Sequence, residues 1–220
     1  GLISVVPVSV RNALEEGMAG LRRETLKEDN KILNNSRAFI IGDNLKALYA
    51  AKAEVRASGL QTVILTSSDA GEARQVASSY LEKIRSLIRK VKKEGRGFCF
   101  LAGGELTVTV KGSGRGGRNT EFALACLLEM EKIRGELSGC DWLIVSLASD
   151  GRDGPTDSAG AWINAESSQL AARAGLNPQN FLDNNDSYSF FEKIGGLIFT
   201  GPTGTNIMDL RFFFIAPAEK

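Results

Sequence analysis

Residues 112–118 contain four glycines and two arginines, inside the stretch VTVKGSGRGGRNTE (108–121). Glycine loses more conformational freedom on ordering than any other residue, so such a cluster forms either a mobile surface turn or a loop that a ligand approaches closely. A strand-like run precedes the loop and a helical pattern follows it, and the backbone N–H groups at a helix start attract anions. Arg115 and Arg118 add positive charge. These residue types predict an anion-binding loop, with a mobile turn as the alternative.

Neither standard nucleotide motif is complete in this loop. The glycines of 112–117 have the spacing G-x-G-x-x-G and also that of a Walker A loop. Arg118 and Asn119 replace the Lys-Ser/Thr pair of the Walker loop, and Asp141 opens the next strand-like run where a dinucleotide site needs an acidic residue at its end. An RGG-type nucleic-acid segment is disfavoured because the glycines lie between a strand and a helix.

Three aspartates follow a later apolar run, in LASDGRDGPTDSAGAW (147–162). Open α/β sheets bind ligands beyond the carboxyl ends of their strands, and carboxylates there can hold Mg²⁺ or accept a proton from a substrate hydroxyl. The spacing of the three is not that of an EF-hand loop. The alternative is that Asp150 and Asp153 form local turns while Asp157 caps the next segment.

Two further polar segments, DNNDSYSFF (183–191) and TGPTGTNIMDL (200–210), precede a helical pattern and the last apolar run. Their hydroxyl and amide groups can hydrogen-bond phosphate or sugar oxygens, although ordinary turns have the same composition. Glu105, after the pair Gly103-Gly104, is either a site residue or a carboxylate at a hairpin edge. The candidates from the two segments are Asn185, Thr203, Thr205 and Asn206.

The composition limits the available chemistry. The chain has 220 residues, 43% of them hydrophobic, a net charge of +1 and no histidine. Without histidine, Ser-His-Asp hydrolysis, Cys-His chemistry and His-based zinc sites are excluded within the chain. The near-neutral charge gives no reason to expect a nucleic acid or a membrane as partner. Cys99, Cys126 and Cys140 lie in apolar surroundings, and we expect buried free thiols in a cytoplasmic protein.

The apolar runs and the N-terminus of the sequence predict a soluble protein that is part of a longer chain. No apolar run approaches the roughly 18–20 residues that span a bilayer, and no basic segment precedes the short apolar stretch at the N-terminus, which argues against a signal peptide. The chain does not begin with methionine. We therefore expect it to be one part of a longer protein.

Hydrophobic periodicity predicts an α/β fold with a mixed sheet flanked by helices on both faces, a variant of the Rossmann architecture. Apolar runs predict single strands at 38–43, 61–67, 141–149 and 210–217. They also predict a hairpin of two strands, 97–103 and 105–111, joined at Gly103-Gly104.

Amphipathic patterns predict the helices between these strands. The expected helices lie at 44–59 with Asn44 as N-cap, at 71–93, at 119–135 and, shorter, at 187–195. Residues 1–37, with a helix from Ser9 to Gly20, are expected to form a connecting arm ahead of one α/β domain over 38–220.

Four motifs occur in order along the chain: GGELTVTVKGSGRGGRNTE, ASDGRDGPTDSAGA, NNDSYSFF and TGPTGTNIMDL. Together they resemble the C-terminal half of the glycerate 2-kinase (MOFRL) family, and the upstream segment IIGDNLKALYAAKAEVRASGLQTVILTSSDAGEAR resembles the part that precedes them. The resemblance covers residues 5–220. The chain departs from it at Thr120, where glutamine is usual, at Arg152, where threonine is common, and at Ile207, where valine is common.

The resemblance implies an enzyme that phosphorylates the 2-hydroxyl of glycerate with ATP and Mg²⁺, in a cleft between two α/β domains. An N-terminal domain that supplies an important lysine would be absent here, so the isolated chain is expected to be inactive. Arg115 and Arg118 would hold the glycerate carboxylate or the transferring phosphoryl group. Asp150 or Asp153 would bind Mg²⁺ or accept the hydroxyl proton. Phosphate oxygens would meet Gly114, Gly116, Gly117 and Asn119.

Two other functions fit parts of the sequence. An NAD(P)H-dependent hydroxypyruvate reductase would use the G-x-G-x-x-G spacing, but it lacks the acidic residue in the right place and a histidine proton donor. A non-catalytic module that recognises a sugar phosphate would bind without turnover. We rank the kinase first, the binding module second and the reductase third.

Overall fold

The computed structural model describes residues 6–218. These residues fall into two units, which are divided between Ile41 and Gly42. The first unit holds the helix α1 (Val8–Met18) and the 3-10 helix η2 (Lys31–Asn35), and no residue of α1 is buried in the structure. The strand predicted at 38–43 is wrong, because residues 36–43 form no regular secondary structure. An apolar run by itself does not specify a strand, because strand formation also depends on pairing with a neighbour.

The second unit is built on one six-stranded sheet with the order β1-β2-β6-β3-β4-β5. β1 and β2 are parallel and every other neighbouring pair is antiparallel, so the predicted mixed sheet is confirmed. The strands are β1 (Gln61–Asp69), β2 (Phe98–Gly104), β3 (Cys140–Ala148), β4 (Gly160–Asn164), β5 (Leu197–Ile198) and β6 (Asp209–Pro217).

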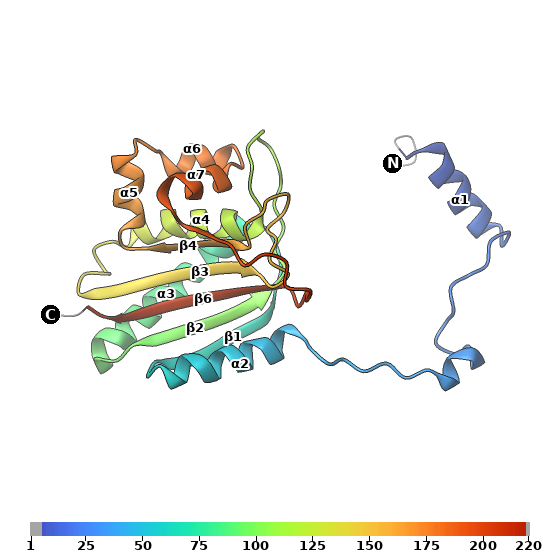
Figure 1. The fold of residues 1–220 in the computed structure, drawn as a ribbon, viewed down its shortest axis with the longest axis horizontal. Coiled ribbons are helices and arrows are strands. Elements are labelled where there is room, and N and C mark those ends of the chain that lie inside the picture. The colour runs from blue at the N-terminus through green and yellow to red at the C-terminus, as the bar shows by residue number, and fades with distance from the viewer. Residues whose placement is uncertain (1–5, 219–220) are drawn as a thin grey trace. The chain divides into compact units, whose positions relative to one another are not determined.

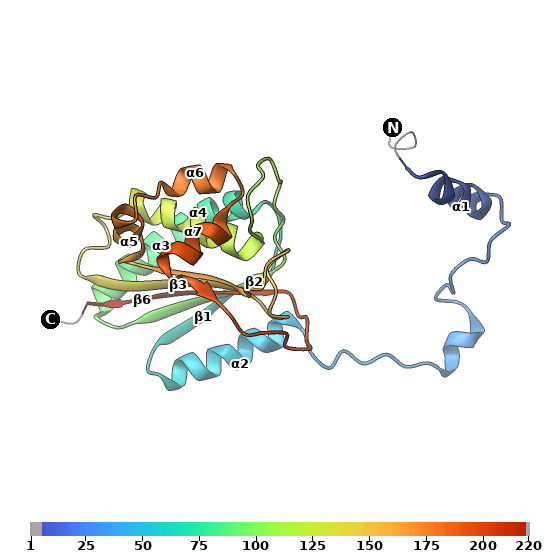
Figure 2. The ribbon, with the colours of Figure 1, turned by 45° about the horizontal axis from the view of Figure 1, so that its top comes forward.

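Helices cover both faces of this sheet, as predicted (Figures 1 and 2). α2 lies on one face, and α3, α4 and the short helices lie on the other. Alternation along β2 produces the two cores: Phe98 and Ala102 join the large core under α3 and α4, while Cys99 and Leu101 pack against Leu48 of α2. The helices of this unit are α2 (Asn44–Ala57), α3 (Ala73–Glu94), α4 (Arg118–Lys132), α5 (Ser167–Arg173), α6 (Pro178–Asp183) and α7 (Ser187–Ile194).

The predicted helices and thiols are confirmed, with one correction at a helix start. The N-cap of α2 is Asp43, whose side chain accepts a hydrogen bond from the Lys46 N–H, and not Asn44. Asn44 is buried instead, and its Nδ2 donates to the main-chain oxygens of Ile207 and Asp209 at 2.9 and 3.0 Å. The three cysteines are free and buried.

The predicted hairpin after β2 is also wrong. Beyond Gly104 the chain makes only an isolated bridge, between Glu72 and Thr107, before it reaches the glycine loop. The reason is topological: β2 already has β1 on one side and β6 on the other, so a returning strand would find neither edge free. Gly104 has φ +134°, and a Cβ there would lie 2.2 Å from the Asp69 nitrogen, so the close approach of β1 requires glycine.

The ends of several strands lie side by side along one end of the sheet. In the strand register, Gly104 is opposite both Asp69 and Asp209, and Ala148 is opposite Asp209. The ends of β1, β2 and β3 and the start of β6 therefore lie together, which places Glu105 and Asp150 near the same edge. Within residues 6–218, no helix combines the length and the apolar character that crossing a bilayer requires.

Candidate functional site

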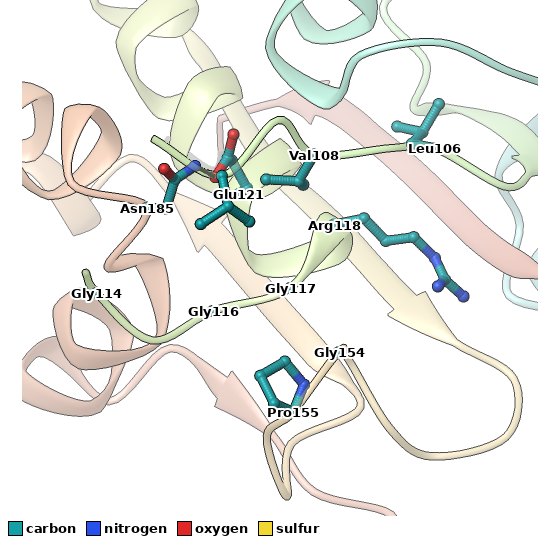
Figure 3. A pocket seen from close by; sticks show the side chains of 11 residues that line it. Leu106, Val108, Gly114, Gly116, Gly117, Arg118, Glu121, Gly154, Pro155 and Asn185 are labelled. Carbon is teal, nitrogen blue, oxygen red and sulfur yellow. Dashed lines mark hydrogen bonds between the residues drawn. The ribbon is translucent and has the colours of Figure 1, made fainter. Parts of the chain in front are cut away.

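A cavity of about 360 Å³ lies between the glycine loop, the start of α4 and the segment after β3 (Figure 3). Its apolar wall comes from Leu106, Val108 and Val110. Figure 3 shows the glycine backbone passing between Asn185 and Glu121 on one side and Pro155 on the other. The residues predicted from the sequence that line the cavity are Gly114, Gly116, Gly117, Arg118 and Asn185.

The glycine loop is held along its length by the segment between α6 and α7. Asn185 Oδ1 accepts hydrogen bonds from the N–H groups of Lys111 and Gly112 at 2.8 and 3.0 Å. The next three N–H groups, of residues 113–115, donate to Asn184 Oδ1, the Asn184 main-chain oxygen and Asp186 Oδ1. The loop is therefore an ordered segment, and most of its amide donors are used inside the protein.

The glycines are required because two backbones approach closely here. A Cβ on Gly114 would lie 2.3 Å from the Asp186 Cβ, and one on Gly116 would lie 2.3 Å from Ser187 Oγ. A Cβ on Gly117 would come within 2.5 Å of Asp153. Close packing thus explains these three glycines before any ligand is considered.

The N-terminus of α4 is occupied by a carboxylate of the protein itself. Asp153 is fully buried and accepts from the N–H groups of Asn119 and Thr120 at 2.8 Å each. It also accepts from Asn119 Nδ2 and Thr120 Oγ1. Burial raises the pKa of Asp153, and the hydrogen bonds from the start of α4 oppose that rise. The positive end of α4 therefore meets Asp153, and Asn119 is turned inward with it.

This arrangement leaves few free donors in the loop. Gly117 N–H donates to Thr120 Oγ1 at 3.0 Å. Among residues 6–218, the Gly116 N–H has no recorded partner. Of the amides predicted to receive phosphate, Gly116 is the one whose donor remains available.

Asn185 links the loop to a buried carboxylate that the sequence did not reveal. It takes a left-handed backbone conformation (φ 53°), and its Nδ2 donates to Glu121 Oε2 at 2.8 Å. Glu121 in turn accepts from Arg74 Nε at 2.7 Å. Arg74 lies on α3, so its spacing in the sequence carried no signal for this contact.

Arg118, the first residue of α4, points away from Asn185 and Glu121 in Figure 3. Its Nε and Nη2 donate to the two carboxylate oxygens of Asp209 at 2.7 and 2.9 Å. Its Nη1 lies 3.3 Å from Glu105 Oε1. The bond to Asp209 is the main reason that the pKa of Arg118 is raised. The predicted residues Arg118 and Glu105 therefore lie close together, and Asp209, which was not among the predicted site residues, is the other acidic partner of Arg118.

Arg115 lies in a different setting from Arg118. Its side chain is 49% exposed and its Nη2 is 3.1 Å from Asp157 Oδ1. The guanidinium stacks over the Tyr188 ring with 4.0 Å between its carbon and the ring centroid. Arg115 is not among the residues that line the cavity.

A second group of predicted residues lies where β3 ends. Asp150 is partly exposed, and its main-chain oxygen accepts from the Thr203 N–H at 3.2 Å. Thr203 Oγ1 donates to the Ser149 main-chain oxygen at 2.6 Å, and Asn206 Nδ2 lies 3.5 Å from Asp150 Oδ2. Thr205 is exposed in the same turn. The loops 149–153 and 200–206 are therefore adjacent.

The acidic residues do not make a protein-only metal cage. Among the described residues, no group of three or more Asp, Glu, Cys or His side chains is placed to hold a metal ion. Mg²⁺ is usually held through one or two carboxylates together with phosphate oxygens and water, so a cage is not needed. Asp150 is partly exposed and remains a candidate for such a site. Asp153 is not a candidate, since both of its oxygens are buried and already accept hydrogen bonds.

Comparison with known proteins gives a consistent result. The model of the MOFRL family matches residues 98–209. The D-glycerate 2-kinase of Thermotoga maritima is 36% identical over 89% of this chain, and the glycerate kinase of Homo sapiens is 36% identical over 99% of it. The crystal structure of the glycerate kinase from Thermotoga maritima superposes with a TM-score of 0.73 at 33% identity over 94% of this chain. The chain spans about half the length of these proteins: 45%, 47% and 50%.

Proposed function

The chain belongs to the MOFRL family, and from this membership we propose that it is part of an enzyme that transfers a phosphoryl group from ATP to the 2-hydroxyl of glycerate. The names of its relatives support the reaction class. The observation that carries the proposal is the cavity, which has Arg118 at its edge. Beside it runs a loop whose glycines leave no room for a larger side chain.

The residues present suit phosphoryl transfer. This reaction depends on positioning and on stabilising charge at the phosphoryl oxygens, and it needs no histidine. Arg118 would bind an oxyanion of the substrate through the part of its guanidinium that Asp209 leaves free. The Gly116 N–H would add a donor from the glycine loop. Arg115, on the outer surface, would contribute at most to the rim of the site.

Mg²⁺ would be held by Asp150 together with phosphate oxygens. The metal would neutralise charge on the phosphoryl group, as it does generally in phosphoryl transfer. Thr203, Thr205 and Asn206, in the adjacent turn, would hydrogen-bond the same phosphates or the waters around them. Asp150→Asn should shift the Mg²⁺ dependence of turnover to higher concentration; an unaltered Mg²⁺ titration would leave Asp150 with a role in the turn alone.

The active site would be completed by a further domain. The relatives are about twice as long as this chain, and the cavity has one polar side and one apolar wall. We propose that glycerate and ATP bind in a cleft between this chain and that domain, and that the 220 residues alone do not turn over.

The direct test is a chimera that joins this chain to the part of the Thermotoga maritima relative it does not match. Release of ADP is followed with D-glycerate and Mg-ATP, and oxidation of NAD(P)H is followed with hydroxypyruvate in a parallel assay. The Thermotoga enzyme itself is the positive control, and omission of glycerate is the blank.

We expect ADP release that depends on glycerate. NAD(P)H oxidation without ADP release would replace the kinase with a reductase. A folded chimera that binds glycerate but is silent in both assays would favour a binding module.

A further inference from the structure

Arg118 has two acidic partners, and they differ in burial and in the hydrogen bonds that they accept. Asp209 is fully buried and accepts two short hydrogen bonds, one on each oxygen. Glu105 has a side chain that is 54% exposed, and it approaches Nη1 at 3.3 Å without a recorded hydrogen bond. One guanidinium therefore has a strong inner contact and a loose outer contact.

The inner partner is itself held from behind. Arg211 Nη2 lies 3.4 Å from Asp209 Oδ2, and Arg211 is completely buried under the Phe122 ring. Asn44 Nδ2 donates to the Asp209 main-chain oxygen at 3.0 Å. Buried charges that lose a partner are strongly unfavourable, so Asp209 has no alternative position to adopt. Its carboxylate is a fixed point at the sheet edge.

The outer partner has no such constraint. Arg118 is its recorded ion-pair partner, and because the Glu105 carboxylate is exposed to water, this ion pair contributes little stability. A carboxylate at Nη1 also resembles chemically what the site is proposed to bind, an oxyanion of a phosphate or of a carboxylic acid. Displacing Glu105 would therefore free a guanidinium edge that is already oriented.

We propose that Asp209 is a positioning residue that fixes Arg118 permanently, and that Glu105 is an exchangeable internal anion which an incoming phosphate or carboxylate displaces. This inference rests on the proposed role of Arg118 in the site. It assigns to Glu105 a function opposite to ligand binding: Glu105 competes with the ligand. Asp209 and its supporting Arg211 act through Arg118 and touch no ligand.

The test measures oxyanion binding to the 220-residue chain by calorimetry, without turnover. Inorganic phosphate and D-glycerate are the two probes, and they distinguish a phosphate from a carboxylate as the displacing group. The variants are Glu105→Gln and Asp209→Asn. Glu136→Gln is the matched control, because it removes a similarly exposed carboxylate from an ion pair with Arg85.

We expect Glu105→Gln to bind its preferred probe roughly two- to fivefold more tightly, the range that corresponds to loss of one exposed ion pair. Asp209→Asn should bind at least about tenfold more weakly, because the guanidinium is no longer oriented. Glu136→Gln should match the parent chain. Weaker or unchanged binding by Glu105→Gln would overturn the exchange, as would the absence of any binding by the parent chain.

A spectroscopic readout covers the case in which Asp209→Asn does not fold. In the parent chain, the Nε–H resonance of Arg118 should be protected from exchange with water and should stay so when the probe is added. Loss of that protection on binding would show that Asp209 is released, and would overturn the fixed partner. These binding results do not depend on turnover, so a silent chimera would refute the proposed reaction and leave this inference standing or falling on its own data.

Discussion

Arg115 and Arg118 leave the same glycine loop three residues apart, yet they enter opposite environments. Arg118 reaches the buried edge of the sheet, where Asp209 has no exposed surface. Arg115 lies over α7, where its partner Asp157 is 66% exposed and Tyr188 supplies a ring face. We call the surroundings of Arg118 and Asp209 the inner region, and those of Arg115 and Asp157 the outer region. The two regions hold the same kind of ion pair, but the inner pair is far more buried than the outer pair.

The difference in burial determines how strong each ion pair is and how firmly it holds its arginine. Water screens the outer pair, so its electrostatic energy is small and its geometry is free to vary. The inner pair is desolvated on one side, which strengthens the interaction and fixes the guanidinium. A site that must hold an oxyanion in one place needs the inner kind. Four predictions test or sharpen this contrast.

The largest effect is expected from the aspartate beneath the inner region. Asp153→Ala removes the acceptor for the Asn119 and Thr120 N–H groups and leaves both buried. We expect the free energy of unfolding to fall by about 2–4 kcal/mol, since a lost helix cap and unpaired buried donors add. Chemical denaturation measures it.

The control for that variant is Asp157→Ala in the outer region. Its denaturation midpoint should stay close to that of the parent, because Asp157 is exposed. Equal losses in the two variants would contradict the contrast between the regions.

The packing of the glycine loop gives the next effect. Gly114→Ala forces a Cβ into the space of Asp186, so it should destabilise the protein by about 1–3 kcal/mol, as overpacking does, and should narrow the cavity. Gly135→Ala is matched, since no atom lies within 4 Å of its added Cβ and its φ is not positive. Thermal denaturation of both variants decides: a loss at Gly135 as large as that at Gly114 would mean that close packing is not the reason for the loop glycines.

Elements with a clear period were predictable because their signal is local. The helix α3, predicted from its apolar face, and the strand β3, predicted from its continuous apolar run, both lie within one or two residues of the predicted bounds. The strand expected at 105–111 did not form, because pairing depends on which strand edges remain free, and β2 had none left. The apolar run at 38–43 formed no strand either. Periodicity reports what a segment can bury and says nothing of its neighbours.

The site was predictable in its loops and not in its contacts. The sequence indicated the glycine loop and the Asp150 turn, since glycine clusters and polar segments after strands are local features. It could not indicate that Asp153 caps α4, or that Asp209 pairs with Arg118, because these partners are 33–34 and 91 positions apart. Neither could it separate Arg115 from Arg118, whose difference lies entirely in what the fold places opposite each one.

The third prediction tests that separation in the proposed enzyme. In the active chimera, Arg118→Ala should lower kcat/KM at least about tenfold, which corresponds to ~1.4 kcal/mol of transition-state stabilisation. Arg115→Ala should change kcat/KM by less than about twofold, because an exposed ion pair contributes little. Steady-state ADP release gives both values. The reverse order would move the oxyanion site to the outer region.

The smallest effect concerns the outer region alone. The pKa of Asp157 is held below its usual range. The largest cause is the hydrogen bond from Tyr188 Oη at 2.8 Å, and the positive charge of Arg115 is a smaller cause. Tyr188→Phe keeps the ring under Arg115 and removes that bond, so the pKa of Asp157 should rise toward its ordinary value of 3.8.

The lowered pKa means that the folded state binds fewer protons than the unfolded state. The contribution of Asp157 to stability is therefore present above its ordinary pKa of 3.8 and is lost as the pH falls through the lower pKa of the folded state. A carboxyl ¹³C titration by NMR measures the shift, and Arg115→Ala should raise the pKa less than Tyr188→Phe does. A larger rise from Arg115→Ala would show that charge, rather than the hydrogen bond, dominates there. The outer ion pair would then be stronger than its exposure allows, and the contrast between the two arginines would lose its physical basis.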